Sequence, residues 1–209
     1  MHLILASSSP RRKEIFALLG LPFEVVSPGL EEVFHPDRTP SEEAIYWAVE
    51  KARAVHRHAP EAIVIGSDTV IDLEGKTIGK PLDQNDAVRI LSLLAGRTHT
   101  VVTSVAAVFP DRDERVAVET TVVRMRPASK EVLVRYAATG EPLDKAGAYS
   151  LQGEGRNLIN SIEGDYLSAV GLPLRAVAAI LSEKGIRPVN DVERIYHTRN
   201  FMNWKSYEE

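Results

Sequence analysis

Short apolar runs and amphipathic stretches alternate along most of the chain. Residues 3–6 and 62–66 are almost wholly apolar, as expected of strands that are covered on both faces. Between them, residues 39–58 carry apolar positions at helical spacing. This stretch opens with Thr39, Pro40 and, three residues after Thr39, Glu42, a pattern that predicts a helix beginning with a capping box.

Capping residues and glycine stops predict the other helices. Ser9 followed by Pro10 predicts a helix that ends before Gly20. Further helices are expected over residues 86–94, 130–139 and 174–184. The other predicted strands are residues 23–27, 100–109 and 116–126, a hairpin around Gly75, and a strand, turn and strand over residues 158–171.

The alternation of these elements predicts an α/β protein with a mixed sheet and flanking helices. Residues 1–188 are expected to form a single domain, or two lobes that share a cleft. Residues 189–209 show no clear period and are expected to form a C-terminal appendage.

Composition excludes several classes of protein. The chain has 209 residues, a formal net charge of −4 and no cysteine, so disulfides and thiolate metal sites are ruled out. No basic face or aromatic stacking platform argues for nucleic-acid binding. No apolar run reaches the roughly 18 residues of a membrane helix, and no secretory signal is visible. A cytoplasmic location is the resulting expectation.

Two arginines lie where a helix usually avoids cations. Arg11 and Arg12 follow Ser9 at the predicted N-terminus of the first helix, where the helix dipole is already positive. Backbone N–H groups and serine hydroxyls there suit a phosphate, which would explain the two cations. The alternative is that both side chains point into solvent, or pair with an acid such as Glu14. The loop is not a Walker A motif.

An acidic residue follows the apolar run 62–66. Asp68 and Thr69 come directly after it, and ligands of open α/β sheets gather beyond the carboxyl ends of strands. A carboxylate there can hold a divalent cation, orient a water molecule or accept its proton. A turn-forming aspartate is an equal alternative.

Other charged residues have an ordinary and a functional interpretation. Lys51 lies at the edge of an apolar helix face and either snorkels to solvent, the commoner outcome, or leans into a cleft. Lys80 stands between Gly79 and Pro81 and contacts phosphate or solvent. Glu31 and Glu32 are each either a metal ligand or an ordinary surface residue.

A glycine-rich stretch, residues 139–166, has little predicted secondary structure, and long irregular stretches in compact domains are usually functional. The amide of Gln152 can both donate and accept, which suits the edge of a nucleobase. His99 is expected to be structural, because the six histidines show no metal-binding spacing.

Three segments together resemble the Maf (septum formation inhibitor) nucleotide pyrophosphatases. They are "LASSSPRRKEIFALLG", "GSDTVI" followed by "GKP", and "TGEPLDKAGAYSLQGEG" continuing to "VGLPL". The resemblance runs from about residue 3 to residue 175. It implies a twisted mixed sheet with two lobes around a deep cleft, similar to inosine triphosphate pyrophosphatases, and a homodimer.

The resemblance also implies an activity: hydrolysis of a nucleoside triphosphate to the monophosphate and pyrophosphate with Mg²⁺ or Mn²⁺. Asp68 matches the proton acceptor and, with Glu32, a metal ligand. The residues that match phosphate contacts are Ser7, Arg11, Lys51 and Lys80, and those that match base-preference positions are Arg12, Thr69 and Gln152. Lys51, Lys80 and Glu32 are therefore expected to act in catalysis, and whether Asp68 works as base or metal ligand stays open.

The stretch "DKAGAYSLQG", with Lys145 and Gln152, resembles the branch that prefers dTTP and UTP. The branch that prefers 7-methyl-GTP generally has an acid where Gln152 stands. Substrate binding by Lys145 and Gln152 is therefore expected. The rival function is a nucleotide-binding regulator of cell division, which needs the cations but not Asp68 as a base.

Overall fold

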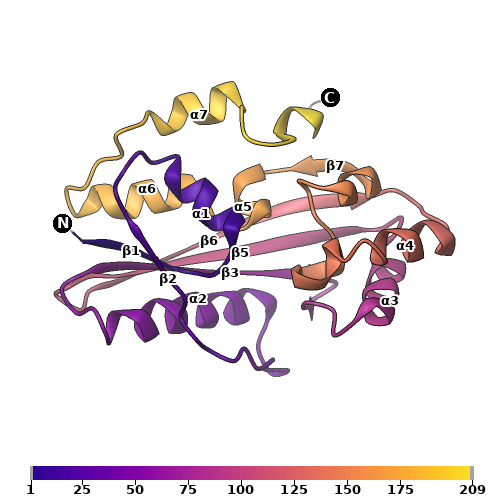
Figure 1. Ribbon diagram of the computed structural model, residues 1–209, viewed down its shortest axis with the longest axis horizontal. Helices are drawn as coiled ribbons and strands as arrows, with labels where there is room; N and C mark the ends of the chain where they lie inside the picture. Colours follow the sequence, from indigo (N-terminus) through magenta and orange to yellow (C-terminus); the bar gives the residue numbers. More distant parts are fainter. Residues whose placement is uncertain (1, 208–209) are drawn as a thin grey trace.

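The computed structural model describes residues 2–207. Within them, a mixed sheet of seven strands runs in the order β2-β1-β3-β5-β6-β7, with β4 beside β3 (Figure 1). The strands are β1 (Leu3–Ala6), β2 (Glu24–Val26), β3 (Ile63–Leu73), β4 (Lys76–Ile78), β5 (Thr98–Val108), β6 (Glu114–Met125) and β7 (Ile159–Glu163). Strand β1 is parallel to both β2 and β3, and the other neighbouring strands are antiparallel. This pairing confirms the predicted mixed sheet.

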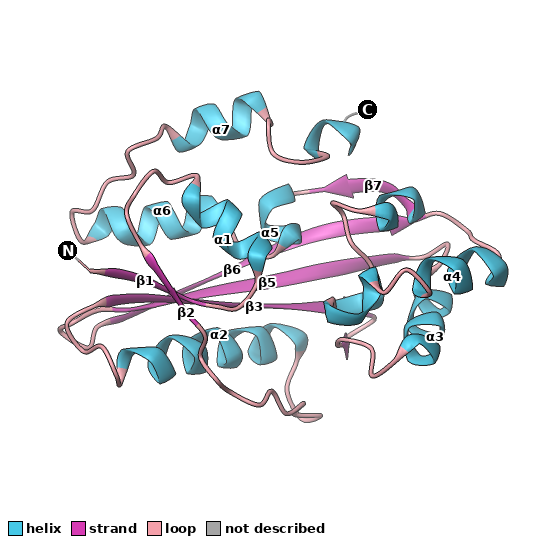
Figure 2. Cartoon of the chain, viewed as in Figure 1, coloured by secondary structure: helices cyan, strands magenta, loops and turns pink. Residues whose placement is uncertain are grey.

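Helices cover both faces of this sheet (Figure 2). They are α1 (Pro10–Ala17), α2 (Pro40–His56), α3 (Gln84–Leu94), α4 (Lys130–Ala137), α5 (Tyr166–Val170), α6 (Leu174–Glu183) and α7 (Val192–Thr198). The capping box of α2 is present, with Thr39 and Glu42 bonded reciprocally. Five helices lie where the sequence predicts them, and α5 and α7 were not predicted.

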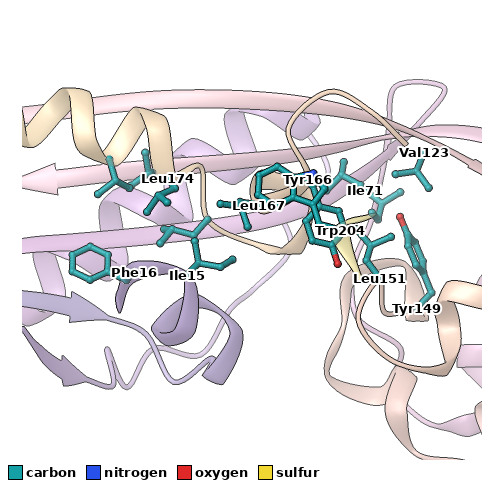
Figure 3. Close-up of a cluster of buried hydrophobic side chains, with 14 of the residues drawn as sticks. Ile15, Phe16, Ile71, Val123, Tyr149, Leu151, Tyr166, Leu167, Leu174 and Trp204 are labelled. Atoms are coloured by element: carbon teal, nitrogen blue, oxygen red, sulfur yellow. The ribbon is translucent and has the colours of Figure 1, made fainter. Parts of the chain in front are cut away.

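Strand β1 is buried on both faces because its side chains alternate between two apolar clusters. Leu3 and Leu5 belong to the large core under α1, α5 and α6, whereas Ile4 and Ala6 pack with α2. Figure 3 shows part of the large core, from Phe16 and Ile15 near Leu174 to Tyr149 near Val123. The apolar run 3–6 therefore correctly predicted a central strand.

The predicted second strand within residues 158–171 is wrong. Only β7 is a strand there, and Tyr166–Val170 forms the short helix α5. The side chain of Asp165 accepts hydrogen bonds from the backbone N–H groups of Leu167 and Ser168. This N-cap stabilises helical geometry over local strand propensity.

The predicted end of the strand at residue 66 is also wrong. Strand β3 continues to Leu73, and its pairing with β5 runs without interruption from Val64 to Asp72. Asp68 and Thr69 therefore lie inside a strand and do not follow one. No helix within residues 2–207 has the length and apolar character needed to cross a membrane.

Candidate active site

A stretch of β3 has an open edge, and the candidate site lies there. On one side of β3, β1 pairs with residues up to Gly66, and β4 begins its pairing at Ile71. Asp68 and Thr69, which lie between these partners, line a cavity of about 240 Å³. From the sequence, Asp68 was expected to reach a ligand crevice because β3 would end before it. In the structure β3 continues, and the crevice at Asp68 opens because β1 ends beside Gly66.

The cavity brings together the ten residues that were expected to act in catalysis or in binding substrate and metal. Its lining includes Ser7, Arg11, Arg12, Glu32, Lys51, Asp68, Thr69, Lys80, Lys145 and Gln152. One wall comes from β3 and the N-terminal segment. A further part of the lining comes from the 3-10 helices η1 (Glu141–Asp144) and η2 (Ala146–Ala148) and the loop before η3 (Glu154–Leu158).

Lys51 is the centre of a buried ion cluster, so the expectation that it snorkels to solvent is wrong. Its Nζ lies 2.6 Å from Asp68 Oδ1 and 2.6 Å from Glu32 Oε1. Lys51 and Asp68 are both buried, whereas the Glu32 side chain is 35% exposed. The two carboxylates therefore share one ammonium group at the inner end of the cavity.

A glycine lets α2 come close enough for Lys51 to reach Asp68. A Cβ on Gly66 would lie 2.3 Å from the Ala48 carbonyl oxygen and 2.8 Å from the Ala52 nitrogen. Because side chains alternate along a strand, Gly66 and Asp68 share the face toward α2. The glycine and the ion pair are thus parts of one helix–strand contact.

The electrostatics of the two carboxylates differ. Burial raises the pKa of Asp68 above its ordinary value, although Lys51 and Arg12 pull it down. Burial acts on Glu32 in the same direction, but the charge and hydrogen bond of Lys51, with Lys80 and Arg12, bring the pKa of Glu32 below its ordinary value. Asp68 is therefore the better proton acceptor of the two.

Arg12 crosses from α1 to the other face of β3. Its Nη2 donates to Thr69 Oγ1 at 3.1 Å, and its Nε donates to the Gly171 carbonyl at 2.8 Å. The Gly171 carbonyl lies just after α5, where the negative end of a helix dipole favours a cation. This contact explains how the fold accommodates Arg12 despite its position at the N-terminus of α1.

Arg11 and Lys145 are far apart in the sequence, but both line the cavity and both contact Asp144. Arg11 Nη1 lies 3.6 Å from Asp144 Oδ2, and Lys145 Nζ donates to Asp144 Oδ1 at 2.5 Å. Lys80 is largely exposed and lies 3.6 Å from Glu32 Oε2. Neither arginine pairs with Glu14 among the ion pairs of the described residues.

Gln152 contributes a buried and unpaired donor. Its Nε2 is shielded from solvent and finds no hydrogen-bond partner among residues 2–207, and the residue lines the cavity. Buried donors without partners are rare and unfavourable. An unpaired amide at the wall of a cavity is the kind of group that a polar ligand would satisfy.

Residues 2–184 match the family described as Maf-like protein. The chain belongs to this family. A dTTP/UTP pyrophosphatase of Symbiobacterium thermophilum is 48% identical over 185 residues, covering 88% of this chain and 94% of that protein. A dTTP/UTP pyrophosphatase of Moorella thermoacetica is 45% identical, with 88% and 95% covered.

Among solved structures, the Staphylococcus aureus Ham1 protein aligns with a TM-score of 0.49 and 16% identity. The alignment covers 77% of this Maf-like chain and 81% of that chain. At this TM-score the likeness supports no further conclusion.

Sequence reasoning missed several residues that shape the site of this Maf-like chain. Thr103 of β5 lies 3.2 Å from Thr69, oxygen to oxygen, and donates to the Ser168 carbonyl at 2.8 Å. Tyr149 lines the cavity and its hydroxyl lies 2.8 Å from Nε2 of His99. The sequence offered one signal for Thr103: it is a polar residue within the largely apolar strand β5.

Two carboxylates of the site suit a divalent cation that also binds phosphate oxygens. No group of three or more His, Asp or Glu side chains placed to hold a metal occurs in the described residues. Mg²⁺ commonly uses one or two carboxylates together with substrate phosphates. Asp68 and Glu32, joined through Lys51, can supply that pair.

Proposed function

We propose that this chain hydrolyses dTTP and UTP to the nucleoside monophosphate and pyrophosphate. The observation that carries the proposal is a buried carboxylate, Asp68, held by Lys51 in a cavity that also presents several cations. Relatives that are 41–48% identical over most of the chain bear the name dTTP/UTP pyrophosphatase, which supports the same substrates.

The charge of the cavity favours a triphosphate. Five cationic side chains line it against three acidic ones, although the whole chain has a net charge of −4. The cations are Arg11, Arg12, Lys51, Lys80 and Lys145. Side chains of this kind stabilise the negative charge that spreads over phosphate oxygens during phosphoryl transfer. Ser7 and the N-terminus of α1 add further donors.

The reaction proceeds by attack of water on the α-phosphorus. The water oxygen forms a bond to phosphorus, the bond from phosphorus to the oxygen bridging toward the β-phosphate breaks, and pyrophosphate leaves with the electron pair. Asp68 accepts the proton of the water. Its raised pKa makes it a stronger base than an ordinary aspartate, and Lys51 fixes its orientation.

We further propose that Mg²⁺ or Mn²⁺ assists this reaction, held by Asp68 and Glu32 together with phosphate oxygens of the substrate. When bound, such a cation offsets negative charge on the phosphates. The two carboxylates and their shared lysine support this assignment. We also propose that the protein is a homodimer, as the resemblance to the family implies, and that it is located in the cytoplasm, as the sequence indicates.

Base preference is assigned to Gln152, Arg12 and Thr69. The amide of Gln152 offers a donor and an acceptor, as the mixed edge of a pyrimidine requires. Its unpaired Nε2 supports this role. Arg12 and Thr69 are held to one another at 3.1 Å, which gives the base or sugar a fixed polar surface.

The test measures pyrophosphate and orthophosphate released by the wild type from dTTP, UTP, CTP, GTP and 7-methyl-GTP, with Mg²⁺, with Mn²⁺ and with chelator. The proposal expects dTMP or UMP with pyrophosphate, a preference for dTTP and UTP, and loss of activity with chelator. Preference for 7-methyl-GTP would contradict the role of Gln152. Tight nucleotide binding without turnover would support the regulator instead.

A further inference from the structure

The C-terminal segment beyond the family match contacts the wall of the candidate site. The match ends at residue 184, and residues 189–207, here called the tail, form α7 and the 3-10 helix η4 (Trp204–Tyr207). The tail corresponds to the predicted appendage, whose last residues, 208–209, lie outside the described part. Figure 1 shows the tail lying across α6, α5 and β7.

Two tail side chains hydrogen-bond to the loop that carries Gln152. The hydroxyl of Tyr207 donates to the Leu151 carbonyl at 2.8 Å, and Asn203 Nδ2 donates to the Gln152 carbonyl at 2.5 Å. Arg156, on η3, donates to Asn203 Oδ1 at 3.3 Å. The tail thus binds the backbone of two consecutive residues, both of which line the cavity.

Neighbouring tail residues are anchored on α5, whose last residues also line the cavity. The rings of Trp204 and Tyr166 stack with centroids 5.4 Å apart, and the Tyr166 hydroxyl donates to the Met202 carbonyl at 2.5 Å. Figure 3 shows Trp204 against Tyr166, with Leu151 in the same cluster. The anchor and the loop contacts therefore lie within one short segment, residues 202–207.

The first two residues of the loop are bonded to regular elements, whereas the residues that carry the Gln152 amide are bonded to the tail. The Tyr149 hydroxyl lies 2.8 Å from His99 Nε2 on β5, and the Ser150 N–H donates to the Tyr136 hydroxyl on α4 at 3.1 Å. Residues 149–153 lie between η2 and η3. Within the loop, Ser150 Oγ accepts from the backbone N–H groups of Gln152 and Gly153, which leaves the carbonyls of Leu151 and Gln152 for the tail. Ordered loops hold a binding group in register only where their backbone groups are bonded.

We propose that the tail is a specificity-determining element of the nucleotide site, which fixes the loop so that the Gln152 amide meets the base. The inference rests on the proposed function, because a specificity role presupposes a nucleotide in the cavity. It adds to that function a segment outside the matched family region.

The experiment uses full-length variants that remove one donor each. Tyr207→Phe keeps the ring and loses the hydroxyl. Asn203→Asp loses the Nδ2 donor but keeps an acceptor for Arg156, and it suits the positive φ of 59° at that position. The matched control Tyr196→Phe removes a tail bond to Asp165, 2.7 Å in the wild type, away from the loop. Lys205→Ala tests an exposed tail side chain.

Two readouts separate specificity from mere stability. The first is the ratio of kcat/KM for dTTP to that for CTP and GTP, and the second is hydrogen exchange of the backbone amides of residues 152–155 without ligand. We expect Tyr207→Phe and Asn203→Asp each to lower the ratio about fivefold and to speed exchange of these amides. The two controls should leave both readouts at wild-type values.

Equal effects of the controls, together with a lower Tm, would overturn the inference, because the tail would then act only through overall stability. Wild-type values in Tyr207→Phe and Asn203→Asp would overturn it as well. Absence of pyrophosphate release by the wild type would refute the proposed function and is a separate result. The exchange comparison would then still decide whether the tail orders the loop.

Discussion

The ammonium group of Lys51 lies 2.6 Å from a carboxylate oxygen of Asp68, and both side chains are buried. Such a pair is destabilising unless both charges are compensated, because two ions have left water. Glu32 gives Lys51 a second partner, and Arg12 adds positive charge near Asp68. These contacts compensate the buried charges at the open edge of β3.

Lys51→Met should shift the pH dependence of catalysis. Lys51 lowers the pKa of Asp68 against the effect of burial, so its loss raises that pKa further. A base works only when deprotonated, so activity falls as pH drops through its pKa. The acid limb of kcat/KM for dTTP should therefore move to higher pH. The control is Lys76→Met on β4, an exposed residue, and coincident acid limbs would contradict the account.

Gly66→Ala should weaken both the fold and the active site. The added Cβ would meet the α2 backbone at 2.3 Å, so the helix must move away from β3. Overpacking of this kind costs about 1–3 kcal/mol, measured as the free energy of unfolding in urea. Activity should also fall, because Lys51 moves with α2. Gly79→Ala is the control, since a Cβ there meets nothing within 4 Å. Equal stability of the two variants would refute the close contact.

Gln152→Glu should change the preferred base. A carboxylate cannot donate to a pyrimidine, so kcat/KM for dTTP and UTP should fall about tenfold or more. The kcat/KM for guanine nucleotides, whose base edge is rich in N–H groups, should rise relative to the kcat/KM for dTTP and UTP. The comparison is Glu154→Gln, an exposed side chain on the same segment. An unchanged ratio of pyrimidine to guanine nucleotides would remove Gln152 from base recognition.

His99 should make stability depend on pH. Burial lowers its pKa from 6.5 to about 4, so the unfolded chain binds a proton that the folded chain does not. The free energy of unfolding should fall by about 1.4 kcal/mol for each pH unit between 6.5 and 4. His99→Gln should lose this slope, and His58→Gln, an exposed position, should keep it. Parallel pH profiles for all three proteins would contradict the assignment.

The sequence was informative where local chemistry decides structure. Pro10 and Thr39 begin helices where predicted, because caps act within one helical turn. The course of β3 beyond Gly66 was not predictable, since Asp68 and Thr69 interrupt the apolar run. The strand continues through them because β3 pairs with β5, whose residues opposite them lie over thirty positions further along the chain.

The sequence predicted which residues lie together in the candidate site, but not which of them contact one another. Motif resemblance indicated which residues belong together, and all of them line one cavity. Lysines at the edge of a helix face usually extend to solvent, so the burial of Lys51 was not expected. It depends on Glu32 and Asp68, which only the tertiary structure brings near it. The contacts of Asn203 and Tyr207 with the loop had no sequence signal, since they join backbone carbonyls to a segment without a clear period.

The most direct test of the account compares Asp68→Asn with Asp72→Asn for pyrophosphate release from dTTP and UTP. Both changes remove a carboxylate from β3, but the Asp72 side chain accepts from the Gly75 N–H at 2.7 Å in the hairpin turn, a contact that asparagine can keep. The account predicts that Asp68→Asn lowers kcat at least about 10²-fold while dTTP still binds, and that Asp72→Asn matches the wild type. Turnover by Asp68→Asn within a few fold of the wild type would contradict its role as the proton acceptor.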